Sequence, residues 1–184
     1  MNKKNREILI KSTLKRFPIN FIKTGRNLFS MAKMGEKTFL PFKIQFESTA
    51  ICNLKCRMCP QNTMKRKKGH LKFEVFKMIY DQIRPPYLNL TGFGEPLLNP
   101  DIFRIIKYAK KRGSFVKLDT NGTLLTEENI DKLLDAKIDV ISNSIDAINK
   151  KTYEKIRIGA NFNQVINNLK KLIEIRNKRK SKTE

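Results

Sequence analysis

The chain has 184 residues, 40% hydrophobic and 9% aromatic, which suffices for one folded domain with a core. Its 39 basic and 17 acidic residues give a formal net charge of +22, and such a charge suits nucleic acid or an anionic membrane surface. The basic residues are spread along the whole chain, however, which favours a lysine-rich background over a nucleic-acid interface. No apolar run approaches the length of a transmembrane helix.

Residues 1–41 are expected to form a basic helical extension. Eleven Lys and Arg fall within residues 1–43, against two acids, and Ile10, Leu14 and Phe17 have the spacing of an amphipathic helix that Pro18 ends. A second helix is predicted over about 19–34. This extension could bind a membrane surface or a partner protein. Its apolar faces are modest, however, so we favour the interpretation that its helices pack on the domain. The N-terminus lacks the apolar segment of a secretory signal.

A first strand is predicted over 42–48, where apolar and polar residues alternate. It runs directly into a loop that holds all three cysteines, Cys52, Cys56 and Cys59, spaced C-x3-C-x2-C. Three thiolates at this spacing can converge on one metal centre, but they are too few to close a four-cysteine iron–sulfur site. With only three cysteine ligands, one metal position stays without a protein ligand, as it does in catalytic zinc sites. Three cysteines in one loop indicate a metal site in a reducing, cytoplasmic compartment rather than a disulfide framework.

A basic loop, Lys65-Arg66-Lys67-Lys68, follows the cysteines, and the only histidine, His70, lies eleven positions beyond Cys59. His70 could complete a Cys3His zinc site. A lone loop histidine is more often simply solvated, so we favour the second interpretation.

The next β/α unit consists of a helix over 73–84, ended by two prolines, and a strand over 87–91. This strand leads into Gly92-Phe93-Gly94-Glu95-Pro96. Glycines let the backbone approach a ligand closely, and a carboxylate beside them can receive an ammonium group. Gly-Glu-Pro also occurs in ordinary turns, so the motif is weak by itself.

A third unit is predicted to begin at Asn99, a good N-cap, followed by Pro100 at the first helical position. The helix should run to about Arg112 and end at Gly113. A strand over 115–119 then leads into Thr120-Asn121-Gly122-Thr123. Without the neighbouring motifs, Asn-Gly would be read as a plain turn.

The last predicted elements begin with a helix capped by Thr126. A strand over 138–145 ends in Ser144-Ile145-Asp146, and a helical stretch carries Arg157. A final helix is expected over about 162–177, followed by a basic tail over 178–184. Strands that alternate with helices in this way predict a parallel α/β sheet whose right-handed crossovers place the helices on one side.

These motifs together resemble the radical S-adenosylmethionine (SAM) enzymes over residues 42–177. The C-x3-C-x2-C loop carries an apolar residue, Met58, just before the last cysteine. Gly94-Glu95-Pro96 is similar to the family's Gly-Gly-Glu-Pro element, with Phe93 replacing a glycine. Thr120-Asn121-Gly122 and Ser144-x-Asp146 match the family's later strand ends, and Ala147 stands where a glycine is often found.

The resemblance implies an enzyme with a [4Fe–4S] cluster on Cys52, Cys56 and Cys59, whose fourth iron binds SAM. One electron then cleaves SAM to a 5′-deoxyadenosyl radical that abstracts hydrogen from a substrate. Met58 would lie near the adenine, and Gly94 and Glu95 would hold the amino group. The remaining implied cofactor-binding residues are Asn121 at the turn, Ser144 and Asp146 near the ribose, and Arg157 near the SAM carboxylate, or else as an exposed helical arginine.

The family's core is a partial (β/α)6 barrel similar to a TIM barrel, and this sequence supplies about four strands. We therefore expect the N-terminal part of a radical SAM core, either a truncated reading frame or one subunit of a split enzyme that a second polypeptide completes. The resemblance also implies a one-electron reductant such as flavodoxin or ferredoxin. The substrate is not readable, with a peptide or an envelope-sugar precursor both open.

Two alternatives remain open. A zinc-binding, nucleic-acid-associated protein would explain the charge and would use the three cysteines with His70. It would not explain the Gly94-Glu95, Asn121 or Ser144-x-Asp146 motifs. A non-catalytic subunit that serves a partner is the other alternative.

Overall fold

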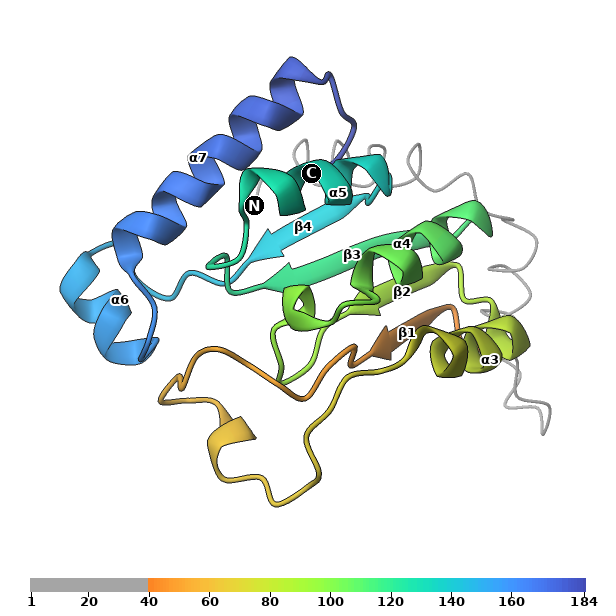
Figure 1. The fold of residues 1–184 in the computed structure, drawn as a ribbon, viewed down its shortest axis with the longest axis horizontal. Helices are drawn as coiled ribbons and strands as arrows, with labels where there is room; N and C mark the ends of the chain where they lie inside the picture. The colour runs from red at the N-terminus through yellow and green to blue at the C-terminus, as the bar shows by residue number, and fades with distance from the viewer. Residues whose placement is uncertain (1–39) are drawn as a thin grey trace, which may run out of the picture. The chain divides into compact units, whose positions relative to one another are not determined.

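The fold was analysed in a computed structural model that describes residues 40–184 (Figure 1). The predicted basic helical extension therefore lies almost entirely outside the described residues. Residues 43–184 form one structural unit.

Four strands form one parallel sheet in the order β1-β2-β3-β4, as the sequence predicted. Their register places Phe46 beside Leu90, and Leu90 beside Leu118. Because all four strands run in the same direction, their C-terminal ends and the loops that follow them meet at one edge of the sheet. The strands are β1 Lys43–Phe46, β2 Tyr87–Leu90, β3 Phe115–Thr120 and β4 Val140–Asn143.

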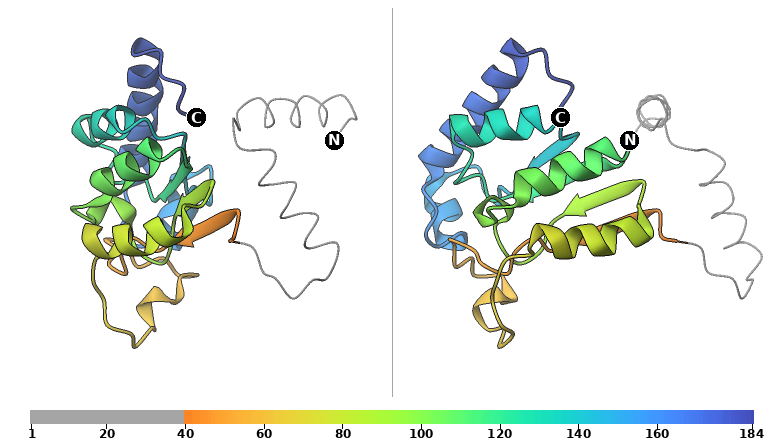
Figure 2. Two further views of the ribbon diagram at one scale, coloured as in Figure 1. Left: turned by 90° about the vertical axis from the view of Figure 1, so that its right-hand side faces the viewer. Right: turned by 45° about the vertical axis from the view of Figure 1, so that its right-hand side comes forward.

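Helices follow the strands in alternation, and α3, α4 and α5 cover one face of the sheet (Figures 1 and 2). The helix α7 packs against α5 and α6. The helical elements are η1 Pro60–Asn62, α3 Phe73–Ile83, η2 Pro96–Leu98, α4 Ile102–Lys111, α5 Glu127–Asp135, α6 Lys150–Ile156 and α7 Phe162–Lys178. The parallel α/β prediction is therefore confirmed.

The hydrophobic core lies between the sheet and this helical layer. Alternate residues of β3 point into it, so that Val116, Leu118 and Thr120 are buried while the residues between them are half-buried. The spacing of Ile102, Ile105, Ile106 and Ala109 places one buried face of α4 against the sheet.

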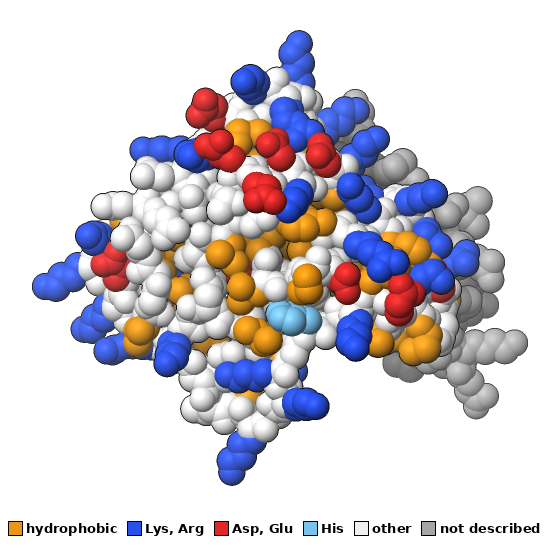
Figure 3. Space-filling view, in the orientation of Figure 1, with side chains coloured by type: hydrophobic (Ala, Val, Ile, Leu, Met, Phe, Trp, Pro, Cys, Tyr) orange, Lys and Arg blue, Asp and Glu red, His pale blue; other side chains and the backbone are white. Residues whose placement is uncertain are grey.

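The surface of the molecule is unevenly charged. Lys and Arg side chains are mixed with acids over the upper and right-hand parts of the face in Figure 3, whereas the charged side chains visible on the lower lobe are all basic. That lobe corresponds to the loop region that projects below the sheet in Figure 1.

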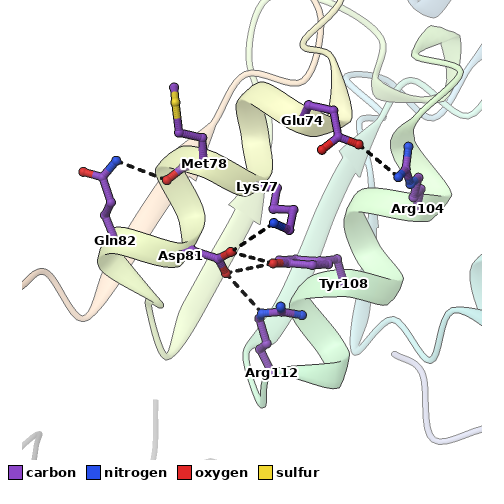
Figure 4. Close-up of polar contacts among 8 residues, drawn as sticks. All are labelled: Glu74, Lys77, Met78, Asp81, Gln82, Arg104, Tyr108 and Arg112. Carbon is purple, nitrogen blue, oxygen red and sulfur yellow. Dashed lines mark hydrogen bonds and ion pairs between the residues drawn. The ribbon is translucent and has the colours of Figure 1, made fainter.

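The helices α3 and α4 are joined on their solvent side by a cluster around Asp81 (Figure 4). The hydroxyl of Tyr108 donates to both carboxylate oxygens of Asp81, at 2.9 and 2.7 Å, and Arg112 Nε donates at 3.2 Å. The Arg112 guanidinium also lies 3.4 Å from the centroid of the Tyr108 ring. The Tyr108 hydrogen bond lowers the pKa of Asp81, so the carboxylate stays ionised. These contacts connect the helices without burying a charge.

The predicted start of α4 is wrong by two residues. Asn99 is not its N-cap: the helix begins at Ile102, and Asp101 precedes it. The buried Asn99 amide instead donates to the carbonyls of Ser48, at 2.6 Å, and Leu71, at 3.0 Å, which ties this loop to the segments after β1. In contrast, Thr126 caps α5 as predicted, with its side chain accepting from Asn129 N.

The strand β4 is shorter than predicted, and the end of the chain packs along it. The strand occupies Val140–Asn143 rather than 138–145 because Ile138 bonds back to Leu133 at the end of α5. On the outer edge, Glu184 N donates to Asp139 O at 2.8 Å, and Ile141 N donates to Glu184 O at 2.7 Å. This is the hydrogen-bond pattern of a parallel strand pair.

Among residues 40–184, no helix combines the length and the apolar composition that crossing a membrane requires.

Core truncation should separate buried from exposed isoleucines. Ile106→Ala, at a fully buried position, is expected to lower the free energy of unfolding by about 2–5 kcal/mol, because it removes apolar contacts and leaves a cavity. Ile148→Ala, at a position 95% exposed, should change it by less than about 0.5 kcal/mol. Urea unfolding measures both, and equal effects would contradict this placement of the core.

Candidate functional site

The cysteine loop follows β1 at the C-terminal edge of the sheet. Cys56 is buried, and Cys52 and Cys59 are half-buried. The loop has no regular secondary structure before η1, so contacts with other segments set its shape.

The end of α6 holds the middle of the cysteine loop. Lys55 N donates to Ile158 O and Arg57 N donates to Ile156 O, both at 2.9 Å. Backbone bonds on either side of Cys56 therefore fix its position relative to α6. A second contact comes from η1, where the Asn62 amide donates to Cys56 O at 3.2 Å.

The Gly92–Glu95 loop after β2 packs directly on the segment that leads into the cysteines. Glu95 N donates to Ile51 O at 2.9 Å. A Cβ atom at Gly94 would overlap the carbonyl oxygen of Thr49 and crowd that of Ile51. Only glycine permits this close approach of two backbones.

Glu95 is 1% exposed and joins β2 to β3. Its Oε1 accepts from Thr120 Oγ1 at 2.7 Å and from Leu97 N at 3.2 Å, while Oε2 accepts from Asn121 N at 2.8 Å. Burial raises the pKa of this carboxyl, and these hydrogen bonds oppose the rise. Because Oε2 accepts one hydrogen bond, it keeps capacity for a further N–H donor.

Asn121 then joins the turn after β3 to the cysteine loop. Its amide donates to Asn53 Oδ1 at 2.9 Å and lies 3.9 Å from the sulfur of Cys52. The Asn53 amide in turn donates to Thr123 Oγ1 at 2.8 Å. The predicted Asn-Gly turn is therefore part of a polar network with the cysteines.

Arg157 lies at the C-terminal end of α6 and is 9% exposed. Its Nε donates to Asp146 Oδ2 at 2.6 Å, which pairs two of the predicted site residues. The exposed helical arginine considered from the sequence is thus wrong. Ser144 N donates to Thr120 O at 3.0 Å, which places Ser144 at the same edge.

The thiols of the loop share one electrostatic environment. Burial raises the pKa of Cys56, and the positive charge of Arg157 opposes the rise. Burial also raises the pKa of Cys52, while the Leu54 N–H bond to its sulfur favours the thiolate. The negative charge of a Cys59 thiolate also raises the pKa of both Cys52 and Cys56.

The three cysteines supply the thiolate ligands that iron–sulfur clusters use. Within residues 40–184, no three His, Cys, Asp or Glu side chains surround one position that a single metal ion could fill. A zinc ion needs all its ligands around one point, whereas in a cubane cluster each thiolate binds a different iron. His70 is exposed and forms a backbone bridge with Thr49. The Cys3His zinc alternative is therefore not supported.

Met58 is the predicted residue that this network does not include. Its side chain is 55% exposed, beside Cys59. Tyr153, which the sequence did not single out, is fully buried on α6 with a hydroxyl that has no partner in the described part of the chain. The charges of Arg157 and Cys56 both act on this hydroxyl.

The sheet face turned away from the helices carries polar residues that sequence reasoning missed. Lys117 Nζ lies 2.8 Å from Asp119 Oδ1, and Asp119 has further side-chain hydrogen bonding with Ser142 and Asn89. Parallel strands covered on both faces are near-continuously apolar. The alternation in β3, Phe115-Val116-Lys117-Leu118-Asp119, was the available signal that one face meets a polar environment.

The sequence matches the Radical SAM superfamily over residues 46–183. The chain belongs to this family of enzymes. It is 40% identical over 124 residues to an AdoMet-dependent heme synthase of Methanosarcina barkeri, covering 65% of this chain and 35% of the relative. It is 30% identical over 135 residues to the mycofactocin maturase MftC of Mycobacterium tuberculosis. This match covers 72% of this chain and 34% of the maturase. The chain thus spans about a third of the length of these two relatives.

The fold is that of solved radical SAM proteins. Streptococcus suis SuiB, crystallised with S-adenosylmethionine, has a TM-score of 0.65 at 17% identity, over 93% of this chain and 42% of SuiB. At this identity the likeness shows the fold alone. The four parallel strands and their helices thus share the fold of the part of SuiB that they match.

Two glycines offer a matched test of the Gly94 contact. Gly94→Ala is expected to lower the free energy of unfolding by about 1–3 kcal/mol, because the new methyl group forces two backbone segments apart. Gly69→Ala should be tolerated, since nothing lies within 4 Å of its Cβ position. Thermal and urea unfolding of both variants measure the difference. A Gly94 variant as stable as the Gly69 variant would contradict the packing described for this loop.

Proposed function

We propose that the chain holds a [4Fe–4S] cluster on Cys52, Cys56 and Cys59 and binds SAM beside it for radical catalysis. One observation carries the proposal: hydrogen bonds connect the cysteine loop to the motifs after β2 and β3 and to the end of α6. The family membership supports the same cofactors. When bound, the cluster and SAM supply a 5′-deoxyadenosyl radical for hydrogen abstraction from a substrate.

The side chains of the site would orient SAM rather than perform the radical chemistry. Glu95, with capacity left on Oε2, would accept from the SAM ammonium, and the Gly94 backbone beside it would help to hold that group. Arg157, buried and oriented by Asp146, would attract the SAM carboxylate.

The other proposed contacts lie around this pair of groups. Ser144 and Asp146 would face the ribose, Met58 would close over the adenine, and Asn121 would keep the Cys52 thiolate hydrogen-bonded. Cys56 and Glu95 are buried, so the inner part of the site would exclude water and would protect a reactive radical.

A peptide is one of two substrate classes that we propose, and an envelope-sugar precursor is the other. The peptide class is favoured by SuiB, which was also crystallised with its precursor peptide SuiA, and by the maturase relative. The Lys117–Asp119 pair on the sheet face away from the helices would offer polar contacts to either substrate.

The proposed enzyme also needs other proteins. A flavodoxin or ferredoxin would deliver the electron, and a second polypeptide would complete the barrel if the chain acts as a subunit of a split enzyme. In that case the chain could also serve a partner without catalysis of its own. We propose the cytoplasm as its compartment, because its thiols must stay reduced.

Cysteine variants test the cofactor assignment. After anaerobic reconstitution with iron and sulfide, Cys52→Ser, Cys56→Ser and Cys59→Ser should each lose the redox-active cluster and reduce SAM cleavage to background, because each thiolate holds one iron. His70→Ala is the matched control and should keep iron, sulfide and cleavage near the wild-type level. Iron and sulfide analysis and chromatography of 5′-deoxyadenosine are the measurements.

Two outcomes would contradict the assignment. One is a cysteine variant that keeps normal SAM cleavage. The other is a wild-type protein that takes up only zinc, with His70→Ala losing that zinc.

A further inference from the structure

We propose that the basic loop, defined as residues 63–69, docks an acidic one-electron donor protein beside the cysteine loop. This inference rests on the proposed function, because the donor protein would deliver the electron that the cluster needs. Beyond the proposed function, the inference identifies the surface to which the donor protein binds and predicts that this protein is acidic.

The charge distribution along the chain is the first observation. Between Glu47 and Glu74 there is no acid, although the segment includes the whole cysteine loop. Seven cations lie in this stretch, namely Lys55, Arg57, Lys65, Arg66, Lys67, Lys68 and Lys72. The lower lobe of Figure 3 shows the result, with blue side chains and no red ones.

Most of these charges are available to a partner. Lys65, Lys67 and Lys68 are exposed, and within residues 40–184 none of them makes an ion pair. Arg66 differs, because it bonds to Glu47 at 2.5 Å. Since Glu47 also accepts from Phe93 N at 2.9 Å, Arg66 fixes the loop to the strand ends and leaves the lysines to face solvent.

The loop is anchored where it joins the cysteine segment. Ala50 N donates to Gly69 O and Leu71 N donates to Ser48 O, both at 2.9 Å. On the other side, the Asn62 amide bonds to the carbonyl of Cys56. A protein bound to the loop would therefore bind beside the segment that carries the cysteines.

An acidic protein fits this surface better than nucleic acid does. Residues 48–72 contain no Phe, Tyr or Trp, and the nearby Phe93 ring, 42% exposed, lies 5.8 Å from the Arg66 guanidinium. A single ring does not supply the series of aromatic platforms on which successive unpaired bases stack. Charge alone suits an encounter complex that forms and dissociates in every turnover, with electrostatic steering of the association rate.

The experiment compares two charge-reversed variants with an acidic flavodoxin as the probe. Lys65→Glu/Lys67→Glu/Lys68→Glu alters the basic loop. Lys107→Glu/Lys111→Glu/Lys170→Glu makes the same change in net charge at exposed positions on α4 and α7. The measurements are calorimetric binding of oxidised flavodoxin to the reconstituted protein and stopped-flow bleaching of the cluster by reduced flavodoxin, each at several salt concentrations.

The loop variant is expected to lose about tenfold or more in binding and in reduction rate at low salt, with a weaker salt dependence than the wild type. The control variant should lose less than about threefold. Dithionite, which needs no docking surface, should reduce all three proteins at the same rate.

Equal losses in both variants, or no loss in either, would overturn the docking surface. So would a poly(dT) strand that binds the loop more tightly than flavodoxin does. If the protein forms no cluster, the proposed function fails, while flavodoxin binding to the variants still decides the docking surface.

Discussion

The site depends on one buried carboxylate. Glu95 accepts hydrogen bonds from Thr120 and Asn121 and so joins the loop after β2 to the turn after β3. Its backbone N–H reaches the segment that leads into the cysteines. A buried carboxylate is costly unless donors surround it. The same donors that stabilise Glu95 therefore fix the distance between three strand ends, and a ligand that adds one more N–H would find a site already assembled.

The cysteine loop shows how an irregular segment can be precisely held. It makes no ladder bonds of its own, yet α6, the Gly94 backbone, Asn121 and Asn62 each restrain it. Parallel topology makes this possible, because every strand delivers its following loop to the same edge. The polar sheet face that bears Lys117 and Asp119 reaches the same edge as the cysteine loop.

The sheet and its helices could be predicted from the sequence because local signals agree with the global fold. Alternation in β3, the apolar face of α4 and the Thr126 cap each depend on near neighbours. Asn99 was assigned wrongly because its amide serves carbonyls far along the chain, at Ser48 and Leu71, and no local pattern reports that. The burial of Arg157 was hidden for the same reason, since only the folded chain brings it to Asp146 and Cys56.

The most direct test of the central claim is electron paramagnetic resonance of the reconstituted protein, reduced with dithionite, with and without SAM. The proposed cluster with one open iron predicts a reduced [4Fe–4S] signal whose g-values change when SAM is added. A cluster signal that SAM leaves unchanged would contradict the account, because it would show that these strand ends do not bring SAM to the iron.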